Sequence, residues 1–277
     1  MGRQNFQIYK SHGGLEKFSN KKLYASLRHS GLPHKQSQII TEQVAREVSE
    51  GSKTRDIYRK TLKLVNQSSH LAAVHYSLKR ALFDLGPSGH NFEAFVAKYF
   101  EEIGYQTKTC QTLKGRLVNH EIDVVGTKNG KRVFVECKFH NRVGIKNDIK
   151  IALYVKARWD DLKQGNEGKS LSAYYLASNT AFTLDAITYA EGSGLNLLGV
   201  NAPTNKPFVE EIKSLHLYPI TSLKRLNSKM KKELLLRNII LAKELPAQLS
   251  LLQKLGLREN EVDPLLAEIE LLNKSIL

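Results

Sequence analysis

The residues with the clearest potential for chemistry lie on either side of a tight turn. In IDVVGTKNGKRVFVECK, residues 122 to 138, Asn129-Gly130 separates two strand-like runs. This dipeptide predicts a two-residue hairpin, because the type I′ turn needs positive φ at both positions. Asp123 lies as far before the turn as Glu136 lies after it, so the hairpin register places the two acids directly opposite each other.

Two opposed carboxylates repel each other and are costly to bury, so they favour a bound cation. A hard divalent ion such as Mg²⁺ suits oxygen ligands. Lys138 lies two residues after Glu136, and alternate residues of a strand share a face. Asp123 and Glu136 are therefore candidate metal ligands, and Lys138 is a candidate for orienting or deprotonating a water that attacks a phosphodiester.

A second interpretation of the hairpin needs no metal. Lys138 lies opposite Glu121 in the same register, so these side chains could form an ordinary cross-strand ion pair on an exposed face. The hairpin alone leaves both interpretations open.

The elements around the hairpin follow an α/β order. Phe92, Phe95, Val96, Tyr99, Phe100 and Ile103 have the spacing of one helix face, and Gly104 is a stop signal. Strands are expected near 105–112, 121–127 and 132–138. A helix through Trp159, a strand at 173–178, a helix capped by Thr183 and a strand at 195–200 follow. We predict an α/β fold whose central mixed β-sheet is flanked by helices.

Residues 87–202 resemble the Mrr-like restriction endonucleases of the PD-(D/E)xK nuclease superfamily. The resemblance is carried by GHNFEAFVAKYFEEIGYQTKTCQ, HEIDVVG, VFVECK and YYLASNTAFTLDAITYAEGSGLNLLGV. It implies that Asp123 and Glu136 are metal ligands, that Lys138 is the catalytic lysine, and that Glu93 is an additional acid near the metal. It also implies Mg²⁺ or Mn²⁺ as cofactor and DNA as substrate. For Glu93 a simpler alternative is a glutamate placed in the first helical turn by the helix dipole.

The first 86 residues predict a short hairpin around Gly13-Gly14 and then helices, the first of them capped by Ser19. FQIYKSHGGLEKFSNKKLYASL resembles the ATP-cone, a nucleotide-binding regulatory domain. The resemblance implies ATP or dATP as ligand, with Lys10 and Lys22 at the phosphates, Glu16 near the nucleotide and Thr54 as a further contact.

Lysines beside a helix N-terminus suit a polyphosphate, since free N–H groups and the helix dipole both favour anions. A basic solvated surface, or direct contact with a nucleic acid backbone, would explain the same lysines. The sequence lacks the GxxxxGK[ST] motif, so it gives no support for ATP hydrolysis by a P-loop mechanism.

The C-terminal residues predict a small helical domain. The segment 84–91 clusters Gly, Pro, Ser and Asn, and the segment 201–207 reads NAPTNKP; both are expected to be linkers. They divide the chain into predicted domains at 1–86, 87–212 and 213–277. The last of these is rich in leucine, lysine and glutamate, with a break near Gly256. We expect it to serve packing, formation of a homo-oligomer or auxiliary contact with DNA.

Composition limits the class of protein. The 277 residues contain 42 Lys and Arg against 27 Asp and Glu, a net charge of +15, which favours an anionic partner. No apolar run approaches the length of a membrane span, the N-terminus lacks a secretory signal, and two cysteines do not suggest a disulfide framework. We expect a cytoplasmic protein without membrane contact.

Together these features predict a Mg²⁺-dependent DNA endonuclease regulated by a nucleotide. The alternative is a nucleotide-sensing DNA-binding regulator that does not cleave. A junction-resolving or repair nuclease would use the same core, because one nuclease fold serves several substrates.

Overall fold

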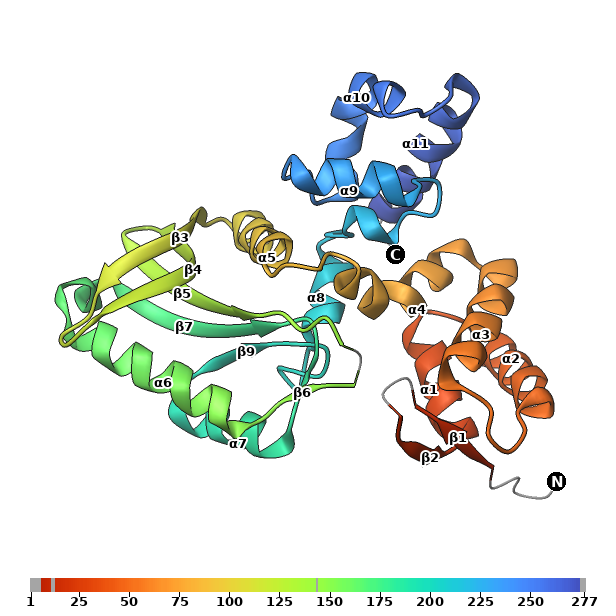
Figure 1. Cartoon of the computed structure of the whole chain (residues 1–277), viewed down its shortest axis with the longest axis horizontal. Coiled ribbons are helices and arrows are strands. Elements are labelled where there is room, and N and C mark those ends of the chain that lie inside the picture. The colour runs from red at the N-terminus through yellow and green to blue at the C-terminus, as the bar shows by residue number, and fades with distance from the viewer. Residues whose placement is uncertain (1–5, 11–12, 143, 275–277) are drawn as a thin grey trace. The chain divides into compact units, whose positions relative to one another are not determined.

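The computed structural model describes residues 6–10, 13–142 and 144–274 (Figure 1). It divides into two compact units. One comprises residues up to Leu78 together with a short piece around Gly144, and the other comprises Lys79–Asn141 and the chain from Ile145 onward. Each unit is described by itself.

The first unit has a short hairpin followed by helices, as predicted. Strands β1 (Gln7–Tyr9) and β2 (Leu15–Lys17) pair antiparallel. Helices α1 (Asn20–His29), α2 (His34–Glu47), α3 (Thr54–Ser68) and α4 (His70–Phe83) follow, and the boundary with the second unit falls within α4. The Ser19 side chain accepts a hydrogen bond from the backbone N–H of Lys22, which confirms the predicted helix cap. Buried side chains such as Leu27, Val44 and Val65 form the core.

The second unit is built on a five-stranded mixed sheet in the order β3-β4-β5-β7-β9. The antiparallel strands are β3 (Gln106–Lys114), β4 (Asn119–Lys128) and β5 (Lys131–Lys138). Strands β7 (Leu171–Ser178) and β9 (Asn196–Leu198) continue the sheet parallel to β5. A second small sheet pairs β6 (Lys146–Asn147) with β8 (Ala181–Phe182). The predicted α/β fold class is confirmed.

Helices cover both faces of the sheet. Helix α5 (His90–Glu102) lies on one face, and α6 (Ile149–Gln164) and α7 (Leu184–Ser193) lie on the other (Figure 1). The short 3-10 helix η1 (Asn166–Lys169) follows α6. Phe134, Val155, Tyr174 and Ala186 belong to the core between the sheet and α6 and α7. Buried residues on both faces explain why β5 and β7 read as nearly continuous apolar runs.

The Asn-Gly hairpin forms as predicted. Asn129 and Gly130 have φ values of 51° and 73°, and the strand pairs run in register from Lys128–Lys131 to Val124–Val135. Both turn residues are therefore left-handed, as a type I′ turn requires.

The segment 201–207 is anchored at its first two residues, whereas residues 203–206 are exposed. Ala202 is buried, and the Asn201 side chain exchanges two hydrogen bonds with the backbone of Phe182. Helix α8 (Phe208–Ser214) follows directly. The Phe208 ring packs edge-on against Phe95 and Tyr99 of α5, so α8 adds to the cover on that face of the sheet.

The C-terminal part is a small helical domain, as predicted. It contains η2 (Ile220–Ser222), α9 (Ser228–Leu236), η3 (Ala242–Gln248), α10 (Leu249–Lys254) and α11 (Glu259–Asn273). Gly256 has a φ of 102° at the predicted break. Leu234, Leu252, Leu265 and Leu272 are buried, whereas Leu236 is 71% exposed.

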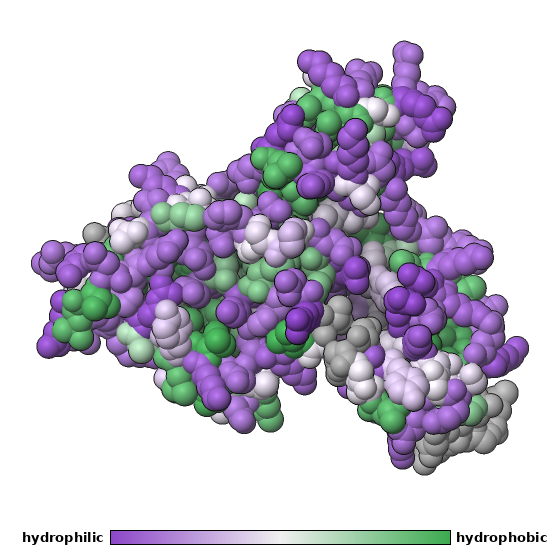
Figure 2. All heavy atoms as spheres, viewed as in Figure 1, coloured by the Kyte–Doolittle hydropathy of each residue, from purple (hydrophilic) through white to green (hydrophobic). Residues whose placement is uncertain are grey.

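Hydrophilic residues cover most of the visible face, with smaller apolar areas between them (Figure 2). Within the described residues, no helix combines the length and the apolar character needed to cross a membrane.

Candidate active site

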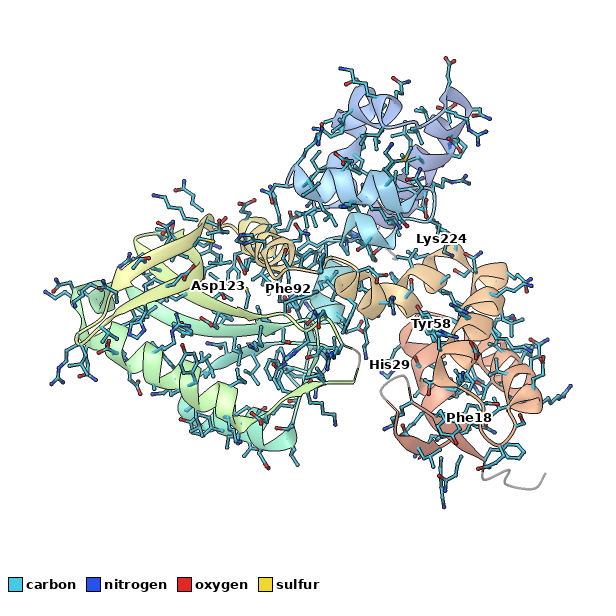
Figure 3. All side chains as sticks on the ribbon, viewed as in Figure 1. Phe18, His29, Tyr58, Phe92, Asp123 and Lys224 are labelled. Carbon is cyan, nitrogen blue, oxygen red and sulfur yellow. The ribbon has the colours of Figure 1, made fainter. Side chains whose placement is uncertain are left out.

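Asp123 lies in the central sheet (Figure 3), where the pairing of β4 with β3 is interrupted and its pairing with β5 has ended. The β3 pairing passes from Thr109–Val124 to Gln111–Ile122 and omits Cys110, whose φ is 52°. The β5 pairing ends at Val124–Val135. The Asp123 carboxylate instead accepts a hydrogen bond of 2.6 Å from the backbone N–H of Cys137. The side-chain carboxylate of Asp123 thus accepts the hydrogen bond that a backbone carbonyl of β4 would accept in a regular sheet. This bond holds the carboxylate at the end of β5.

Asp123 and Glu136 affect each other electrostatically. Burial raises the pKa of Asp123 to about 6, although the Cys137 N–H opposes this rise, and the nearby charge of Glu93 adds to it. Burial and the charge of Asp123 raise the pKa of Glu136 to about 7. Three carboxyl groups from α5, β4 and β5 therefore share one electrostatic environment, which is typical of functional sites.

Arg158 of α6 is the cation that contacts this group of acids. Its guanidinium forms an ion pair with Glu136 and donates a second hydrogen bond to the backbone carbonyl of Glu121. Its side chain is only 10% exposed. Sequence reasoning missed this residue, although an arginine beside Trp159, between the apolar positions Val155 and Leu162, was a visible signal. Such a placement indicates a buried partner for the charge.

Lys138 lies at the end of β5 with an exposed side chain, and its charge opposes the rise in the pKa of Glu136. Among the residues described, Lys138 forms no ion pair with Glu121. The ion pair of the simpler interpretation is therefore not formed there, although both side chains are exposed.

A buried polar network holds the backbone of Lys138. The Ser178 hydroxyl donates to the Lys138 carbonyl oxygen at 2.8 Å, and Asn147 Nδ2 donates to Ser178 Oγ at 2.9 Å. Asn147 is 1% exposed, and its Oδ1 lies 2.8 Å from His140 Nε2. Sequence reasoning did not identify this network. It links β5, β6 and β7 at the backbone of Lys138.

Glu93, on the first turn of α5, has two further neighbours that sequence reasoning missed. His90 Nδ1 lies 3.1 Å from Glu93 Oε2, and the Cys110 thiol donates weakly to the same oxygen at 3.9 Å. The ligand atoms of these three residues lie within 4.8 Å of one another. Burial and the charges of Glu93, Glu121 and Asp123 raise the pKa of Cys110. Glu93 thus faces other polar groups rather than serving only as a helix-dipole partner.

Aromatic packing positions the start of α5 against the end of β5. The Phe139 ring, next to Lys138, lies 6.4 Å from Phe83 and 5.9 Å from Phe92 between ring centroids. A Cβ atom on Gly86 would come within 2.7 Å of this ring. Glycine therefore allows the loop before α5 to approach the strand that carries Glu136 and Lys138.

The carboxylate oxygens of this site are the kind of ligand that a hard divalent ion prefers. Asp123 and Glu136 are partly buried acids, and neighbouring negative charge raises the pKa of each; a bound cation would relieve this repulsion, and Glu93 adds a third carboxylate. Burial without such a cation is unfavourable for both groups.

The four residues predicted to contact a nucleotide lie near the β1–β2 hairpin in the first unit. Lys10 Nζ is 2.9 Å from Glu16, and Lys22 forms a second ion pair with the same carboxylate. These two hydrogen-bonded ammonium groups lower the pKa of Glu16 to about 2. The Thr54 hydroxyl donates to the backbone oxygen of Tyr9 at 2.9 Å. Three of the four side chains thus form one cluster, and Thr54 is fixed beside the residue that precedes Lys10.

Comparisons with known proteins identify two domains within the second unit. A restriction endonuclease family model matches residues 86–202, and the model "AF1548-like, C-terminal" matches residues 218–273. A protein of Archaeoglobus fulgidus described as uncharacterized is 32% identical over 174 residues, which are 62% of this chain and 97% of that protein.

A solved structure, "Crystal Structure of Protein of Unknown Function AF1548", is 29% identical with a TM-score of 0.54. The match covers 68% of this chain and 100% of that one. Both family matches lie beyond residue 85, so the nucleotide-binding interpretation of the first unit stays a prediction. The chain belongs to the AF1548-like family and joins a restriction-endonuclease domain of the PD-(D/E)xK type to an AF1548-like C-terminal domain.

Proposed function

We propose that the protein is a Mg²⁺-dependent DNA endonuclease that hydrolyses phosphodiester bonds under the control of ATP or dATP. The observation that carries the proposal is the pair of partly buried carboxyl groups, Asp123 and Glu136, whose pKa values are raised to about 6 and about 7. The exposed ammonium group of Lys138 follows on the same strand. The restriction-endonuclease family match supports DNA as the substrate.

Asp123 and Glu136 would hold Mg²⁺ or Mn²⁺, with Glu93 as a further acid beside them. When bound, the ion would stabilise the negative charge that develops on the phosphodiester. The Cys137 N–H fixes the orientation of the Asp123 carboxylate, and Arg158 fixes that of Glu136. Lys138 orients the attacking water and helps to remove its proton.

Plasmid nicking with Mg²⁺ tests this proposal. We expect the wild type to nick supercoiled DNA and Lys138→Ala to lose at least about 100-fold in rate, which is the scale of one acid–base group. Lys131→Ala is the matched control, because Lys131 lies on the same strand but adjoins the turn. Equal rates in Lys138→Ala and the wild type would remove Lys138 from the chemistry.

The alternative function is a nucleotide-sensing DNA-binding regulator without cleavage activity. Its support is the ion pair of Arg158 with Glu136, which partly neutralises the acids with a cation of the chain itself. Retarded migration of DNA without nicking, in Mg²⁺ and Mn²⁺ and with or without nucleotide, would favour this alternative.

Nucleotide control is proposed from the cluster in the first unit. Lys10 and Lys22 would bind the phosphates, while Glu16 and Thr54 would lie near the nucleotide. Calorimetric titration with ATP and dATP tests the site: the double variant Lys10→Ala/Lys22→Ala should lose binding. Lys21→Ala is the control, since Lys21 neighbours Lys22 on α1. Unchanged affinity in the double variant would overturn the assignment.

The proposed substrate also sets the expected location. A DNA endonuclease of this type would act in the cytoplasm, and a second copy of the chain could pair through the C-terminal helices. Light scattering of the purified protein tests the homo-oligomer.

A further inference from the structure

A groove opens between the nuclease domain and the C-terminal domain of the second unit. It has a volume of about 1220 Å³, and its walls come from three elements. One face of α5 lines it from His90 to Glu101, the outer part of β3 lines it from Thr107 to Cys110, and α9 lines it from Ser228 to Leu236.

The groove leads to the candidate active site. Glu93 and Cys110 are among its lining residues, and Cys110 is the residue of β3 that lies opposite Asp123. A chain molecule lying in the groove would therefore pass beside Glu93, the acid next to the proposed metal ligands.

Lysine side chains line the groove on both of its walls. Lys108 projects from β3 with an exposed side chain, and Lys231 and Lys232 project from α9. The Lys231 ammonium is half-buried and lies 3.3 Å from the backbone oxygen of Thr221; burial lowers its pKa, and the charges of Asp84 and Glu268 oppose that fall. These three lysines, from two domains, are available to an anion.

The acids that line the groove have partners of their own. Asp84 pairs with Arg80 at 2.9 Å. Glu101 lies 3.4 Å from Lys98 and accepts a hydrogen bond from Thr107. Glu93 belongs to the active-site cluster. Apart from Glu93, the described charged groups of the groove that lack a partner of opposite charge are therefore lysines.

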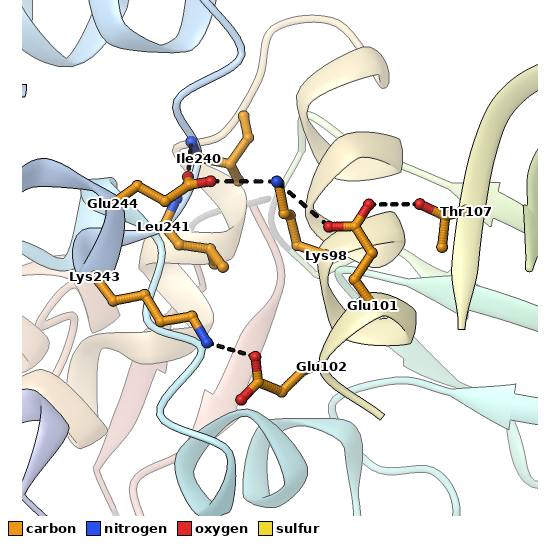
Figure 4. Close-up of polar contacts among 8 residues, drawn as sticks. All are labelled: Lys98, Glu101, Glu102, Thr107, Ile240, Leu241, Lys243 and Glu244. Carbon is orange, nitrogen blue, oxygen red and sulfur yellow. Dashed lines mark hydrogen bonds and ion pairs between the residues drawn. The ribbon is translucent and has the colours of Figure 1, made fainter. Parts of the chain in front are cut away.

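Polar contacts fix the wall formed by the C-terminal domain (Figure 4). Lys98 of α5 lies 3.3 Å from Glu244, which in turn accepts hydrogen bonds from the backbone N–H groups of Ile240 and Leu241. Lys243 pairs with Glu102 at 2.5 Å. These contacts run beside the groove and hold the C-terminal domain against the helix that carries Glu93.

We propose that the groove between α5 and α9 holds the sugar-phosphate backbone of DNA next to the bond that is cut, and that Lys231 and Lys232 of the C-terminal domain contact its phosphates. The choice of DNA as the ligand rests on the proposed function. It gives the C-terminal domain a role in binding substrate, in addition to packing.

DNA binding to the Lys138→Ala protein tests this proposal without interference from cleavage. Fluorescence anisotropy of a labelled duplex would be measured over a series of salt concentrations. In this background, Lys231→Ala/Lys232→Ala should weaken binding about tenfold and reduce the slope of log affinity against log salt by about 1 for each lysine. Lys108→Ala, on the opposite wall, should reduce the slope by about 1.

Lys229→Ala is the matched control, because Lys229 lies on the same helix but does not line the groove. Its salt slope should equal that of the parent protein. An unchanged slope in the double variant, or an equal change in Lys229→Ala, would overturn the groove assignment. Lys108→Ala keeps the test informative if the α9 variant does not fold.

The two proposals fail separately. If the wild type never nicks DNA but the groove variants bind more weakly, the groove stands and the endonuclease proposal fails. If the wild type nicks DNA and the groove variants bind normally, only the groove proposal fails.

Discussion

The Asp123 carboxylate accepts a hydrogen bond of 2.6 Å from the backbone N–H of Cys137, one residue beyond Glu136. This contact extends the attachment of β4 to β5 past the last paired residues, Val124 and Val135. It favours the ionised carboxylate, but burial outweighs it, and the pKa of Asp123 rises to about 6. The candidate metal ligands are therefore fixed in place and poorly solvated, and this combination leads to the predictions below.

Metal affinity should depend steeply on pH. Both acids must be ionised to bind a divalent cation, and their pKa values in the metal-free protein are raised to about 6 and about 7. We expect Mg²⁺ affinity to be nearly constant above about pH 7.5, to fall about tenfold per pH unit between 7 and 6, and to fall more steeply below 6. Calorimetric titration between pH 5.5 and 8 measures this dependence. Glu136→Gln should weaken binding and remove the step near pH 7.

The same shifts make the metal-free protein less stable as pH rises. The folded-state pKa of each acid lies above its ordinary value of 3.8 or 4.5. The folded protein therefore binds more protons than the unfolded chain between about pH 4 and 7. The resulting stabilisation is complete below about pH 4 and is lost as pH rises through 6 to 7.

Asp123→Asn tests this relation, because asparagine removes the charge and keeps an oxygen that can accept from the Cys137 N–H. With EDTA at pH 8, we expect Asp123→Asn to raise the free energy of unfolding by about 2 kcal/mol, the equivalent of one to two pKa units. At pH 4 the difference should be small. A gain of equal size at both pH values would exclude burial of the charge as the cause.

Arg158→Met should destabilise the protein by about 3 kcal/mol at neutral pH, because it leaves the buried Glu136 and the Glu121 carbonyl without their charged partner. Urea unfolding measures the change. The loss should shrink in a Glu136→Gln background, where no carboxylate is left unpaired. Additive effects of the two substitutions would show that the ion pair carries no coupling energy.

The hairpin turn should be sensitive to a single methyl group. Gly130 has a φ of 73° and open space around its Cβ position, so Gly130→Ala should cost about 1 kcal/mol through backbone strain alone. Gly192 in α7 also has open space but lacks a positive φ. Gly192→Ala should therefore stabilise by up to about 1 kcal/mol. Opposite shifts in Tm are expected, and shifts of the same sign would contradict the conformational explanation.

Glu16→Gln should separate phosphate binding from recognition of the nucleoside. The substitution releases Lys10 and Lys22 from their shared carboxylate, and it should change stability by less than about 1 kcal/mol because the ion pairs are partly exposed. Inorganic tripolyphosphate should then bind severalfold more tightly in calorimetry. If Glu16 lies near the nucleotide as proposed and contacts its nucleoside part, ATP should gain less than tripolyphosphate, and equal gains would argue against that contact.

The sequence by itself determined the features that depend on neighbours along the chain. Asn129-Gly130 fixed the turn and, through the turn, the register of β4 and β5 as far as Val124–Val135. Ser19 and Thr183 cap the helices that they were expected to cap. Such features follow from local backbone geometry and hydrogen bonding, which a short stretch of residues contains in full.

Tertiary structure alone decided which distant groups surround those residues. Arg158 reaches Glu136 from α6, Cys110 reaches Glu93 from β3, and α9 faces α5 across a groove. Each contact joins segments far apart in the sequence, so it depends on how whole helices and strands pack. Periodicity shows which face of an element is buried, but it does not show which partner covers that face.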